Sequence, residues 1–438
     1  MEECDFLIHN GTILTMESRE SFLQNGFLAI RGDSIFRIGA SEAENPPPAK
    51  RVIDAGGGLV LPGLVNGHTH ASMSLFRGLA DDLPLMEWLN KYIFPVESRM
   101  DADFVHVGAL LACAEMILAG TTTFCDMYLF EEEVARAARQ SGMRCLVGEV
   151  LYDFPSPNYG TLQKGFDYTV RMIERWKDDP LVSVAVEPHA VYTCSPELLL
   201  EANRIALEHG VPLIIHASET LSEVSEVTAR YGKRPVEHLD SLGILSDALI
   251  AIHCVHLNEG EISALHERRV KVISSPESNM KLASGIPPVP ELLSAGITVG
   301  LGTDGCASNN DLDLFSEMDT AAKLHKVASM DPTQMDAFTV LRMATAEGAK
   351  ALGMEAITGT LTEGKRADLI LVDTRKPHLT PLYDPYSHLV YAARGSDVTH
   401  SFINGNLVMQ DRRLLTLDAD EVMEKAEHRA RDVLRWIL

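Results

Sequence analysis

Short apolar runs alternate with helix-length segments through the middle of the chain. The longer segments carry apolar residues at helical spacing and end near glycine, as helix C-termini do. The apolar runs read as eight strands at residues 59–68, 121–127, 144–150, 182–188, 212–218, 249–255, 271–276 and 298–304. Strands that alternate with helices in this number predict an α/β fold, a (β/α)8 TIM barrel, rather than an open doubly wound sheet.

Both ends of the chain show a different pattern, with short strands and turn dipeptides. Asn-Gly and Gly-Asp favour two-residue turns between strands. Tight hairpins are therefore predicted at Asn10-Gly11, Gly32-Asp33 and Asn404-Gly405. The segment from Ala419 onward has helical periodicity instead, and Asp418 or Asp420 is expected to be its N-cap.

These two patterns predict a barrel and a small β-sandwich domain that both chain ends build together. Residues 1–61 are expected to form the first part of the sandwich, and residues 62–358 the barrel. Residues 359–438 are expected to complete the sandwich and to add the C-terminal helix.

Composition excludes several classes of function. The 438 residues include 62 acidic and 38 basic side chains, a formal net charge of −24, which disfavours binding to nucleic acid or to an anionic membrane. The chain has neither a signal-peptide pattern at its start nor the roughly 18 consecutive apolar residues of a membrane helix. Its 7 cysteines are scattered without a CxxC pair, which is typical of reduced thiols. We therefore expect a soluble, cytoplasmic protein.

Residues able to bind a metal or move a proton occur where the predicted strands end. In a TIM barrel these ends meet at one mouth, where active sites lie. His68 and His70 are two residues apart, so on a strand they point to the same face. With His216 from the fifth strand and Asp304 from the eighth, they form a mixed nitrogen and oxygen donor set. This set suits one Zn²⁺ or Fe²⁺ ion and leaves a position for water.

Two further polar residues suit hydrolytic chemistry at such an ion. A metal-bound water ionises near neutral pH, and the reaction then needs a group that accepts and returns its proton. Glu219, three residues after His216, is placed for that role. His253, at the end of the sixth strand, is expected to orient the hydroxide.

Five motifs, taken together and in barrel order, resemble the amidohydrolase superfamily. They are PGLVNGHTH (62–70), IHASET (215–220), HCVHL (253–257), GTDGCASNN (302–310) and GTLTEGKRADLILVD (359–373). Within the superfamily they resemble the branch of S-adenosylhomocysteine and methylthioadenosine deaminases, which is related to guanine deaminases and triazine hydrolases. The resemblance covers essentially the whole chain and implies a metal-bearing barrel beside a composite β-sandwich.

The resemblance also implies a role for each candidate residue. The implied metal ligands are His68, His70, His216 and Asp304, and the implied catalytic residues are Glu219, His253 and Asp304. The implied substrate contacts are Glu97 at the ribose hydroxyls, His189 at the purine, Trp88, Ser308, Glu219 and Asp304. Plainer interpretations remain open for three of them: a helix-start acid for Glu97, a packing residue for Trp88 and turn chemistry for Ser308.

The function implied by the resemblance is hydrolytic deamination of an adenosine-type nucleoside to its inosine analogue and ammonia. The substrate is 5′-methylthioadenosine, S-adenosylhomocysteine, adenosine or 5′-deoxyadenosine. The chain departs from the S-adenosylhomocysteine-type members of this branch at one point. Its loop 152–165 has no arginine that could pair with the carboxylate of S-adenosylhomocysteine, and only Lys164 is near in the sequence. This loop favours the smaller substrates.

Several alternatives stay open at this point. The same chemistry serves a deaminase of guanine or another free base, and an s-triazine (chloro)hydrolase. A barrel that binds metal without catalysis is a further alternative. The fourth strand lacks a lysine that could be carbamylated between two metals, so one metal is expected, zinc before iron. The partner is a small molecule, and the architecture is compatible with a homo-oligomer.

Overall fold

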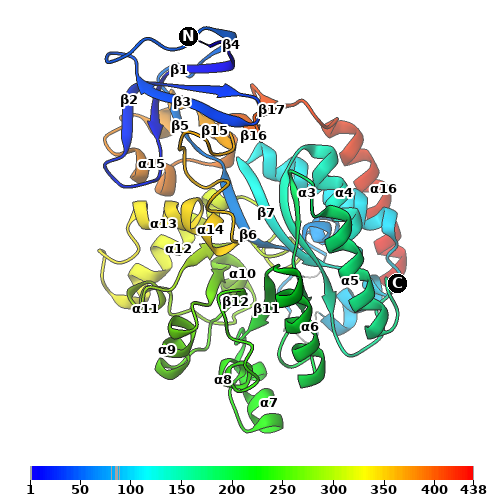
Figure 1. Ribbon diagram of the computed structural model, residues 1–438. Coiled ribbons are helices and arrows are strands. Elements are labelled where there is room, and N and C mark those ends of the chain that lie inside the picture. The colour runs from blue at the N-terminus through cyan, green and yellow to red at the C-terminus, as the bar shows by residue number, and fades with distance from the viewer. Residues whose placement is uncertain (1, 80, 84–86, 88, 438) are drawn as a thin grey trace.

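The structure is a computed structural model that describes residues 2–79, 81–83, 87 and 89–437. Its centre is a barrel of parallel strands that follow one another in chain order (Figure 1). These strands are β6 (Leu64–Thr69), β7 (Thr121–Tyr128), β8 (Arg144–Leu151), β9 (Val182–Val184) with β10 (Glu187–Pro188), β11 (Leu213–Ala217), β12 (Leu249–His253), β13 (Lys271–Ser274) and β14 (Val299–Leu301).

Hydrogen bonds close the barrel at its two seams. The fourth strand joins the fifth through a parallel bridge between Val186 and Leu213. The eighth strand returns to the first, where the backbone N–H of Asp304 donates to the carbonyl oxygen of His68 at 2.9 Å. The predicted (β/α)8 fold class is therefore confirmed.

Helices cover the outside of the barrel (Figure 1). The helices of the described residues, including some that do not lie on the barrel wall, are η1 (Ala71–Phe76), η2 (Leu89–Ile93), α2 (Phe94–Glu97), α3 (Ala102–Leu118), α4 (Glu131–Ser141), α5 (Leu162–Trp176), α6 (Pro196–His209), α7 (Leu221–Tyr231), α8 (Pro235–Ser241), α9 (Glu259–Glu267), α10 (Pro276–Lys281), α11 (Val289–Ser294), α12 (Leu314–Ser329), α13 (Ala337–Met343), α14 (Ala346–Ala351), η3 (Pro377–Leu379), α15 (Pro385–Tyr391), η4 (Gly395–Asp397) and α16 (Ala419–Ile437). No helix in the described part of the chain is long and apolar enough to cross a membrane.

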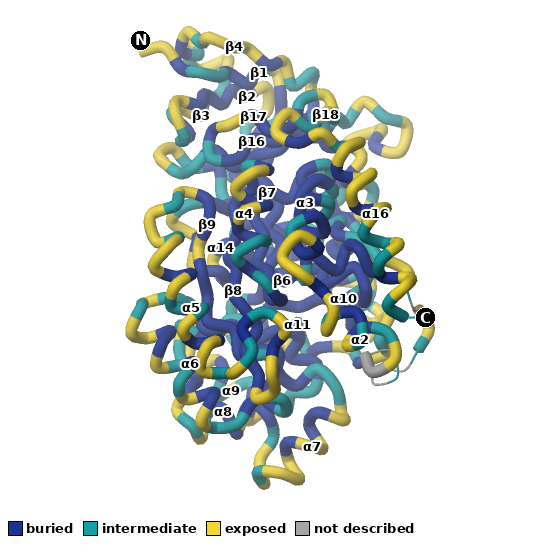
Figure 2. Tube along the Cα trace, turned by 90° about the vertical axis from the view of Figure 1, so that its right-hand side faces the viewer, coloured by how far each residue is buried: buried dark blue, intermediate teal, exposed yellow. Residues whose placement is uncertain are grey.

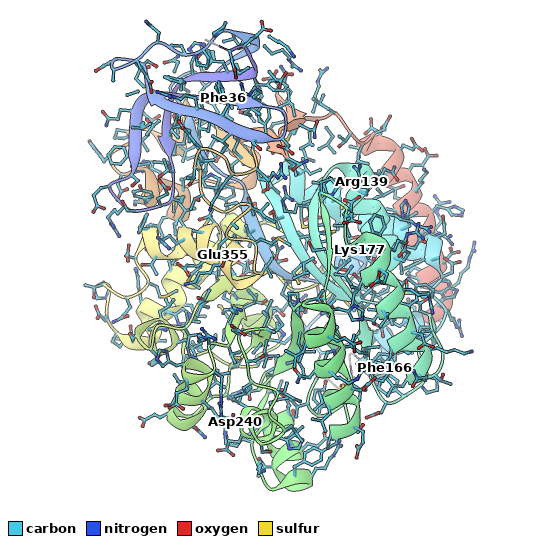
Figure 3. All side chains as sticks on the ribbon, in the orientation of Figure 1. Phe36, Arg139, Phe166, Lys177, Asp240 and Glu355 are labelled. Carbon is cyan, nitrogen blue, oxygen red and sulfur yellow. The ribbon has the colours of Figure 1, made fainter. Side chains whose placement is uncertain are left out.

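Each outer helix turns one apolar stripe toward the barrel, as helix α5 illustrates. Its buried residues recur at helical spacing and include Phe166, Thr169 and Ile173. Figure 3 shows Phe166 on this helix, with Arg139 and Lys177 as charged side chains near the outer surface. The barrel strands themselves are buried along nearly their whole length, which places the core inside and around the barrel (Figure 2).

Strands from both chain ends pair in a second, nine-stranded sheet above the barrel (Figure 1). They are β1 (Cys4–Leu14), β2 (Phe22–Arg31), β3 (Ser34–Ala40), β4 (Ala49–Asp54), β5 (Leu59–Pro62), β15 (Leu369–Val372), β16 (Val398–Ile403), β17 (Asn406–Gln410) and β18 (Arg413–Leu414). Strand β5 joins the two ends, because it pairs with β1 on one side and with β15 on the other. The division of the chain at residues 61 and 358 stays a prediction.

The first predicted barrel run, residues 59–68, is two strands rather than one. Strand β5 belongs to the nine-stranded sheet and β6 to the barrel, and Gly63 separates them. A side chain at Gly63 would collide with Thr122, because its Cβ would lie 2.1 Å from the threonine Oγ1. The apolar pattern continues across the break since both strands are buried, so the pattern alone misses it.

One of the three predicted hairpins is wrong. Asn10-Gly11 lies inside strand β1 as a bulge, where Asn10 adopts φ 57° and its side chain donates to Asp54 at 2.7 Å. The other two are confirmed. Gly32-Asp33 connects β2 to β3, and Asn404-Gly405 connects β16 to β17 with φ values of 50° and 75°, which suit a type I′ turn.

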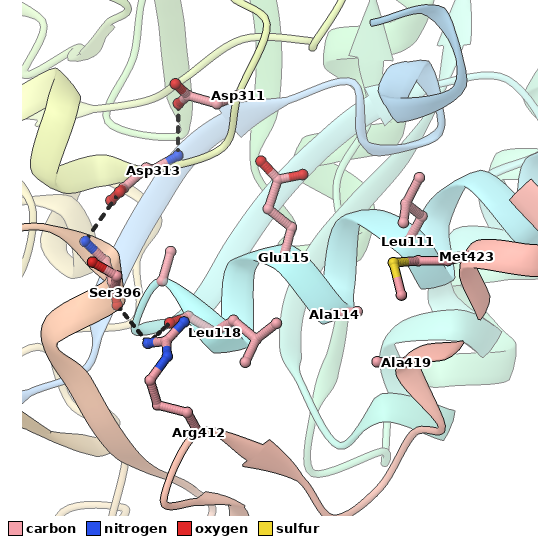
Figure 4. Close-up of a pocket in the computed structure, with 12 residues that line it drawn as sticks. Leu111, Ala114, Glu115, Leu118, Asp311, Asp313, Ser396, Arg412, Ala419 and Met423 are labelled. Atoms are coloured by element: carbon pink, nitrogen blue, oxygen red, sulfur yellow. Dashed lines mark hydrogen bonds between the residues drawn. The ribbon is translucent and has the colours of Figure 1, made fainter. Parts of the chain in front are cut away.

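The C-terminal helix α16 packs along α3 on the barrel wall. The rings of Phe104 and Trp436 lie 5.5 Å apart between the two helices. Asp418 is the N-cap, since its Oδ1 accepts from the backbone N–H groups of residues 420 and 421. Figure 4 shows the crevice at the start of this segment, where Arg412 donates to the carbonyl oxygens of Leu118 and residue 395.

Candidate active site

The four predicted metal ligands meet at the carboxyl end of the barrel. Nε2 of His68 lies 3.2 Å from Nε2 of His216, although 148 residues separate them. Oδ1 of Asp304 lies 3.2 Å from Nε2 of His70 and 3.6 Å from Nε2 of His68. The parallel strands β6 and β11 and the turn after β14 bring these atoms to one point.

Two of the imidazoles are oriented so that they present a lone pair to this point. Nδ1 of His216 faces the carbonyl oxygen of His189 at 2.7 Å, and Nδ1 of His70 faces the carbonyl oxygen of Met127. A carbonyl oxygen only accepts, so each Nδ1 carries the proton and each Nε2 is an electron-pair donor. Nitrogen lone pairs and a carboxylate oxygen that converge in a buried place fit a divalent cation such as zinc or iron.

Burial opposes protonation of His70, but Asp304 outweighs it and raises the pKa of His70 to about 9, so a cation would compete with a proton at its Nε2. Burial lowers the pKa of His68 to about 4 and holds the pKa of His216 well below its usual range, helped by the neighbouring imidazoles. Burial opposes ionisation of Asp304, but His68 and His70 outweigh it and hold the pKa of this carboxyl well below normal. Asp304 therefore keeps its negative charge although its side chain is buried.

Left-handed backbone conformations aim two of the site residues inward. His253 has φ 69° and Asp304 has φ 65°, and neither is glycine. Such conformations cost about 1–3 kcal/mol each and concentrate at functional sites. The strain is offset by the hydrogen bonds that hold both residues, including the one from the Ser278 hydroxyl to Oδ2 of Asp304 at 2.6 Å.

The proposed proton-transfer residues lie beside the ligands. Nε2 of His253 is 3.9 Å from Oε2 of Glu219 and 4.0 Å from Oδ2 of Asp304. Its Nδ1 faces Oδ1 of Asn279 at 3.0 Å, which fixes the ring. Burial raises the pKa of Glu219, which favours its protonated form.

A cavity of about 350 Å³ opens beside the cluster, and five of the six predicted substrate contacts line it, Glu219 and Asp304 among them. Glu97 accepts from the Tyr128 hydroxyl at 2.7 Å, and burial raises the pKa of Glu97. His189 lies against Thr193, with Nδ1 2.8 Å from the hydroxyl oxygen. Ser308 also lines the cavity. Trp88, the sixth, lies outside the described residues.

Sequence reasoning missed several residues that act on the site. Tyr128 holds Glu97, Asn279 holds His253, and Ser278 contacts both Asp304 and Ser308. Tyr128 ends the second barrel strand, while Ser278 and Asn279 follow the seventh. Inspecting the ends of all eight strands, rather than only those that carry histidine or acid, would have found them.

The outer wall of the cavity is aromatic and carries no basic residue. The rings of Tyr152 and Phe154 stack at 3.8 Å with an interplanar angle of 11°. Lys164 is exposed on helix α5 and does not line the cavity. Among the described residues of the lining, none is lysine or arginine.

Comparison with known proteins gives consistent matches. Residues 59–408 match the model of the Amidohydrolase family. A 5-methylthioadenosine/S-adenosylhomocysteine deaminase of Syntrophobacter fumaroxidans is 60% identical over 98% of this chain and 98% of its own length. A 5′-deoxyadenosine deaminase of Methanosarcina mazei is 46% identical, with the same coverage of 98% for each chain.

Solved structures match over the whole fold. An adenosine deaminase from Xanthomonas campestris with bound zinc has a TM-score of 0.97 at 39% identity and covers 99% of each chain. A triazine hydrolase has a TM-score of 0.90 at 23% identity over 97% of this chain and 99% of its own, which supports the fold alone. With the family model and the curated relatives, these matches confirm the predicted resemblance: the chain belongs to the amidohydrolase family.

Proposed function

We propose that this chain is a metal-dependent hydrolase that removes the 6-amino group of an adenosine-type nucleoside. The observation that carries this proposal is the convergence of three imidazoles and Asp304 beside a cavity that also holds Glu219 and Glu97. The first set suits a hydrolytic metal, and the two glutamates suit proton transfer and recognition of a sugar. The names of the relatives, which are deaminases of adenosine derivatives, support the same reaction class.

The reaction replaces the C6–N bond of the purine with a C6–O bond. When bound, a zinc or iron ion makes water a hydroxide nucleophile near neutral pH. Asp304 accepts the proton that this water loses, and Nε2 of His253 orients the attack on C6. Glu219, whose protonated form burial favours, donates to the ring nitrogen next to C6. The proton taken up by Asp304 then passes to the amine, the C6–N bond breaks to release ammonia, and the C6 hydroxyl returns a proton to Glu219, which leaves the inosine analogue.

Recognition of the substrate falls to the residues of the cavity. His189 contacts the purine, and Ser308 lines the same cavity. The Glu97 carboxylate accepts hydrogen bonds from the two ribose hydroxyls, a geometry that a free base does not offer. A contact of Trp88 with the sugar stays a prediction.

The identity of the metal, the cellular compartment and the oligomeric state are part of the same proposal. We favour one zinc ion per chain, because the donor set suits it and the adenosine deaminase neighbour binds zinc. All seven cysteines are free and buried, which suits the cytoplasm. The partner is a small-molecule nucleoside, and a homo-oligomer is compatible with the fold.

Turnover of adenosine, 5′-methylthioadenosine and 5′-deoxyadenosine, followed by the change in purine absorbance, tests the reaction. We expect ammonia and the inosine analogue in equal amounts. If the zinc-loaded protein turns over none of these nucleosides, the proposal is wrong.

A deaminase of guanine or another free base is the competing candidate, and Glu97 separates the two. Replacing Glu97 with alanine should lower kcat/KM for a nucleoside by about 100-fold, because charged hydrogen bonds to both ribose hydroxyls are lost. Turnover of a free base should change little. If kcat/KM fell equally for the nucleoside and for the free base, Glu97 would not act through the ribose, and the free-base activity would be favoured.

A further inference from the structure

Helix α7 follows the turn that carries Glu219, and it buries an acid that the proposed mechanism does not use. The buried residues of this helix are Glu223, Val224 and Val227, so a carboxyl group shares the inward face with two valines. Only 4% of Glu223 is exposed. Burial of a carboxyl group is unfavourable unless hydrogen bonds offset it, so its partners indicate its role.

The partners of Glu223 are two successive backbone N–H groups. The N–H of Ser218 donates to Oε1 at 2.9 Å, and the N–H of Glu219 donates to Oε2 at 2.7 Å. Ser218 has φ 54°, a left-handed conformation, and successive N–H groups in such a turn form a concavity that suits an anion. The carboxyl group of Glu223 fills this concavity from within the chain.

The carbonyl groups of the same turn are held by the next barrel strand. The N–H of Cys254 donates to the carbonyl oxygen of Ala217 at 3.1 Å, and the N–H of His256 donates to that of Ser218 at 2.9 Å. Both donors follow strand β12. The turn is therefore held from two sides, through its carbonyl groups by the end of β12 and through its N–H groups by Glu223.

We propose that Glu223 is a positioning residue, whose two hydrogen bonds fix the backbone of Glu219 and so direct the Glu219 carboxyl group into the cavity. This inference rests on the proposed function, in which Glu219 transfers the proton. Glu219 lines the cavity, and its Oε2 lies 3.9 Å from Nε2 of His253. A displacement of about 1 Å at a reacting group can lower a rate about 100-fold, so a fixed backbone at this turn serves the reaction.

The two N–H groups also bear on the charge of Glu223. Burial raises the pKa of Glu223 to about 8, and the N–H groups of Ser218 and Glu219 act against this rise. Both oxygens of Glu223 accept hydrogen bonds, which suits the ionised form. Turnover of the variants is therefore compared at pH 9, where the carboxylate predominates.

Two substitutions of Glu223 remove its acceptors in steps. Glu223→Ala removes both, whereas Glu223→Gln keeps the size of the side chain and one acceptor oxygen. With adenosine and the zinc-loaded protein, we expect kcat to fall about 100-fold in the alanine variant and about tenfold in the glutamine variant. KM and zinc content should stay within about threefold, because Glu223 does not line the cavity. If the alanine variant does not fold, the glutamine variant decides.

Glu261 is the matched control, because it is also a buried acid in the first turn of a helix, here α9. It accepts from the backbone N–H of Asn258 at 3.0 Å and from Arg234 at 2.8 Å, and neither partner lines the cavity. Glu261→Ala should leave kcat within about threefold. An equal fall of kcat in both alanine variants, or a loss of zinc in Glu223→Ala, would show that Glu223 supports the fold in general, and the inference would be wrong.

Amide hydrogen exchange tests the positioning without turnover. The N–H groups of Ser218 and Glu219 should exchange at least about tenfold faster in Glu223→Ala than in the unmodified protein, and at an unchanged rate in Glu261→Ala. Unchanged exchange in Glu223→Ala would overturn the inference, whatever the reaction. Faster exchange in a protein that deaminates no nucleoside would uphold the contact with Glu219 and contradict the proposed function instead.

Discussion

Two sets of buried carboxyl groups share this barrel, and they differ in their partners. At the mouth, Asp304 lies among imidazoles, 3.2 Å from His70. Beside strands β7, β8 and β10 lies a second set, which we call the inner acid cluster, and its members are Asp126, Glu131, Glu149 and Glu187. All four are fully buried, and both carboxyl oxygens of Glu187 lack a hydrogen-bond partner among the described residues.

The difference shows that partners, rather than depth, decide whether a buried acid stays charged. Burial raises the pKa of Glu149 to about 7. Burial, with the neighbouring Asp126 and Glu149 adding to it, raises the pKa of Glu187 well above its usual range. The same burial at Asp304 is outweighed by imidazoles, which hold its pKa well below normal. Burial therefore favours the protonated forms in the inner acid cluster, whereas the neighbouring imidazoles favour an ionised oxygen at Asp304.

The largest expected effect, on zinc content and turnover, follows the loss of one metal-site side chain at the mouth. A substitution in the inner acid cluster serves as the comparison. His216→Ala removes a nitrogen donor, so zinc content should fall and kcat/KM should drop by at least about 1000-fold. Glu187→Gln keeps the shape of a group that is already protonated, so zinc content and turnover should stay within about threefold. Metal analysis and the nucleoside assay measure both variants.

A loss of zinc in Glu187→Gln equal to that in His216→Ala would contradict the difference between the two sets of carboxyl groups. It would mean that the inner acid cluster supplies charge to the metal site despite its lack of cationic partners.

The next effect separates proton transfer from metal binding within the mouth. Glu219→Gln keeps the size of the side chain but cannot deliver a proton, so kcat should fall by about 10²–10⁴-fold while zinc content is unchanged. Glu149→Gln is the control, because it makes the same chemical change at a buried acid outside the cavity. An active Glu219→Gln variant would remove the proposed shuttle.

Part of the candidate ligand set could be inferred from the sequence because some of its signals are local. His68 and His70 share one strand, and Glu219 follows His216 by three residues, so spacing alone relates them. The residues that hold these groups could not be predicted this way. The contact of Tyr128 with Glu97 spans 31 residues, and its partners carry no shared motif.

The fold shows the same division between local and distant information. Alternation of apolar runs and helices predicts the barrel, since it depends on periodicity within each segment. The break at Gly63 and the bulge at Asn10 depend on which strand lies alongside, because both positions are set by neighbours far along the chain. Hydrophobicity is the same on either side of the break, so pattern cannot locate it.

A third prediction uses the raised pKa values of the inner acid cluster. Glu149 has a pKa of about 7 when folded, and an unfolded glutamate has one of about 4.3. Between these values the folded state binds more protons, so the stabilising effect of the protonated group is complete below about pH 4 and is lost as pH rises to about 7. Glu149→Gln removes this dependence and should gain about 3 kcal/mol relative to the unmodified protein between pH 4.5 and pH 8.

Urea unfolding at the two pH values measures the difference. The glutamine keeps an oxygen that can accept from the backbone N–H of Glu131, which Glu149 accepts at 2.9 Å, so the fold should persist. An equal free-energy difference between the two proteins at both pH values would contradict a raised pKa for Glu149.

The smallest expected effect concerns Glu97, which belongs to neither set of carboxyl groups. It lines the cavity at the mouth, but its hydrogen-bond partner is the phenol of Tyr128 rather than a cation. Tyr128→Phe removes the 2.7 Å hydrogen bond that orients it. KM for a ribonucleoside should rise by about tenfold, with kcat changed less than about threefold, because one hydrogen bond to a charged group is lost in binding. KM for the 2′,3′-dideoxy analogue should not change, since Glu97 has no hydroxyl to accept from. Tyr159→Phe, whose hydroxyl donates to the carbonyl of Val150 at 3.1 Å, is the matched control, and an equal rise of KM for both nucleosides would show that Tyr128 supports the fold rather than Glu97.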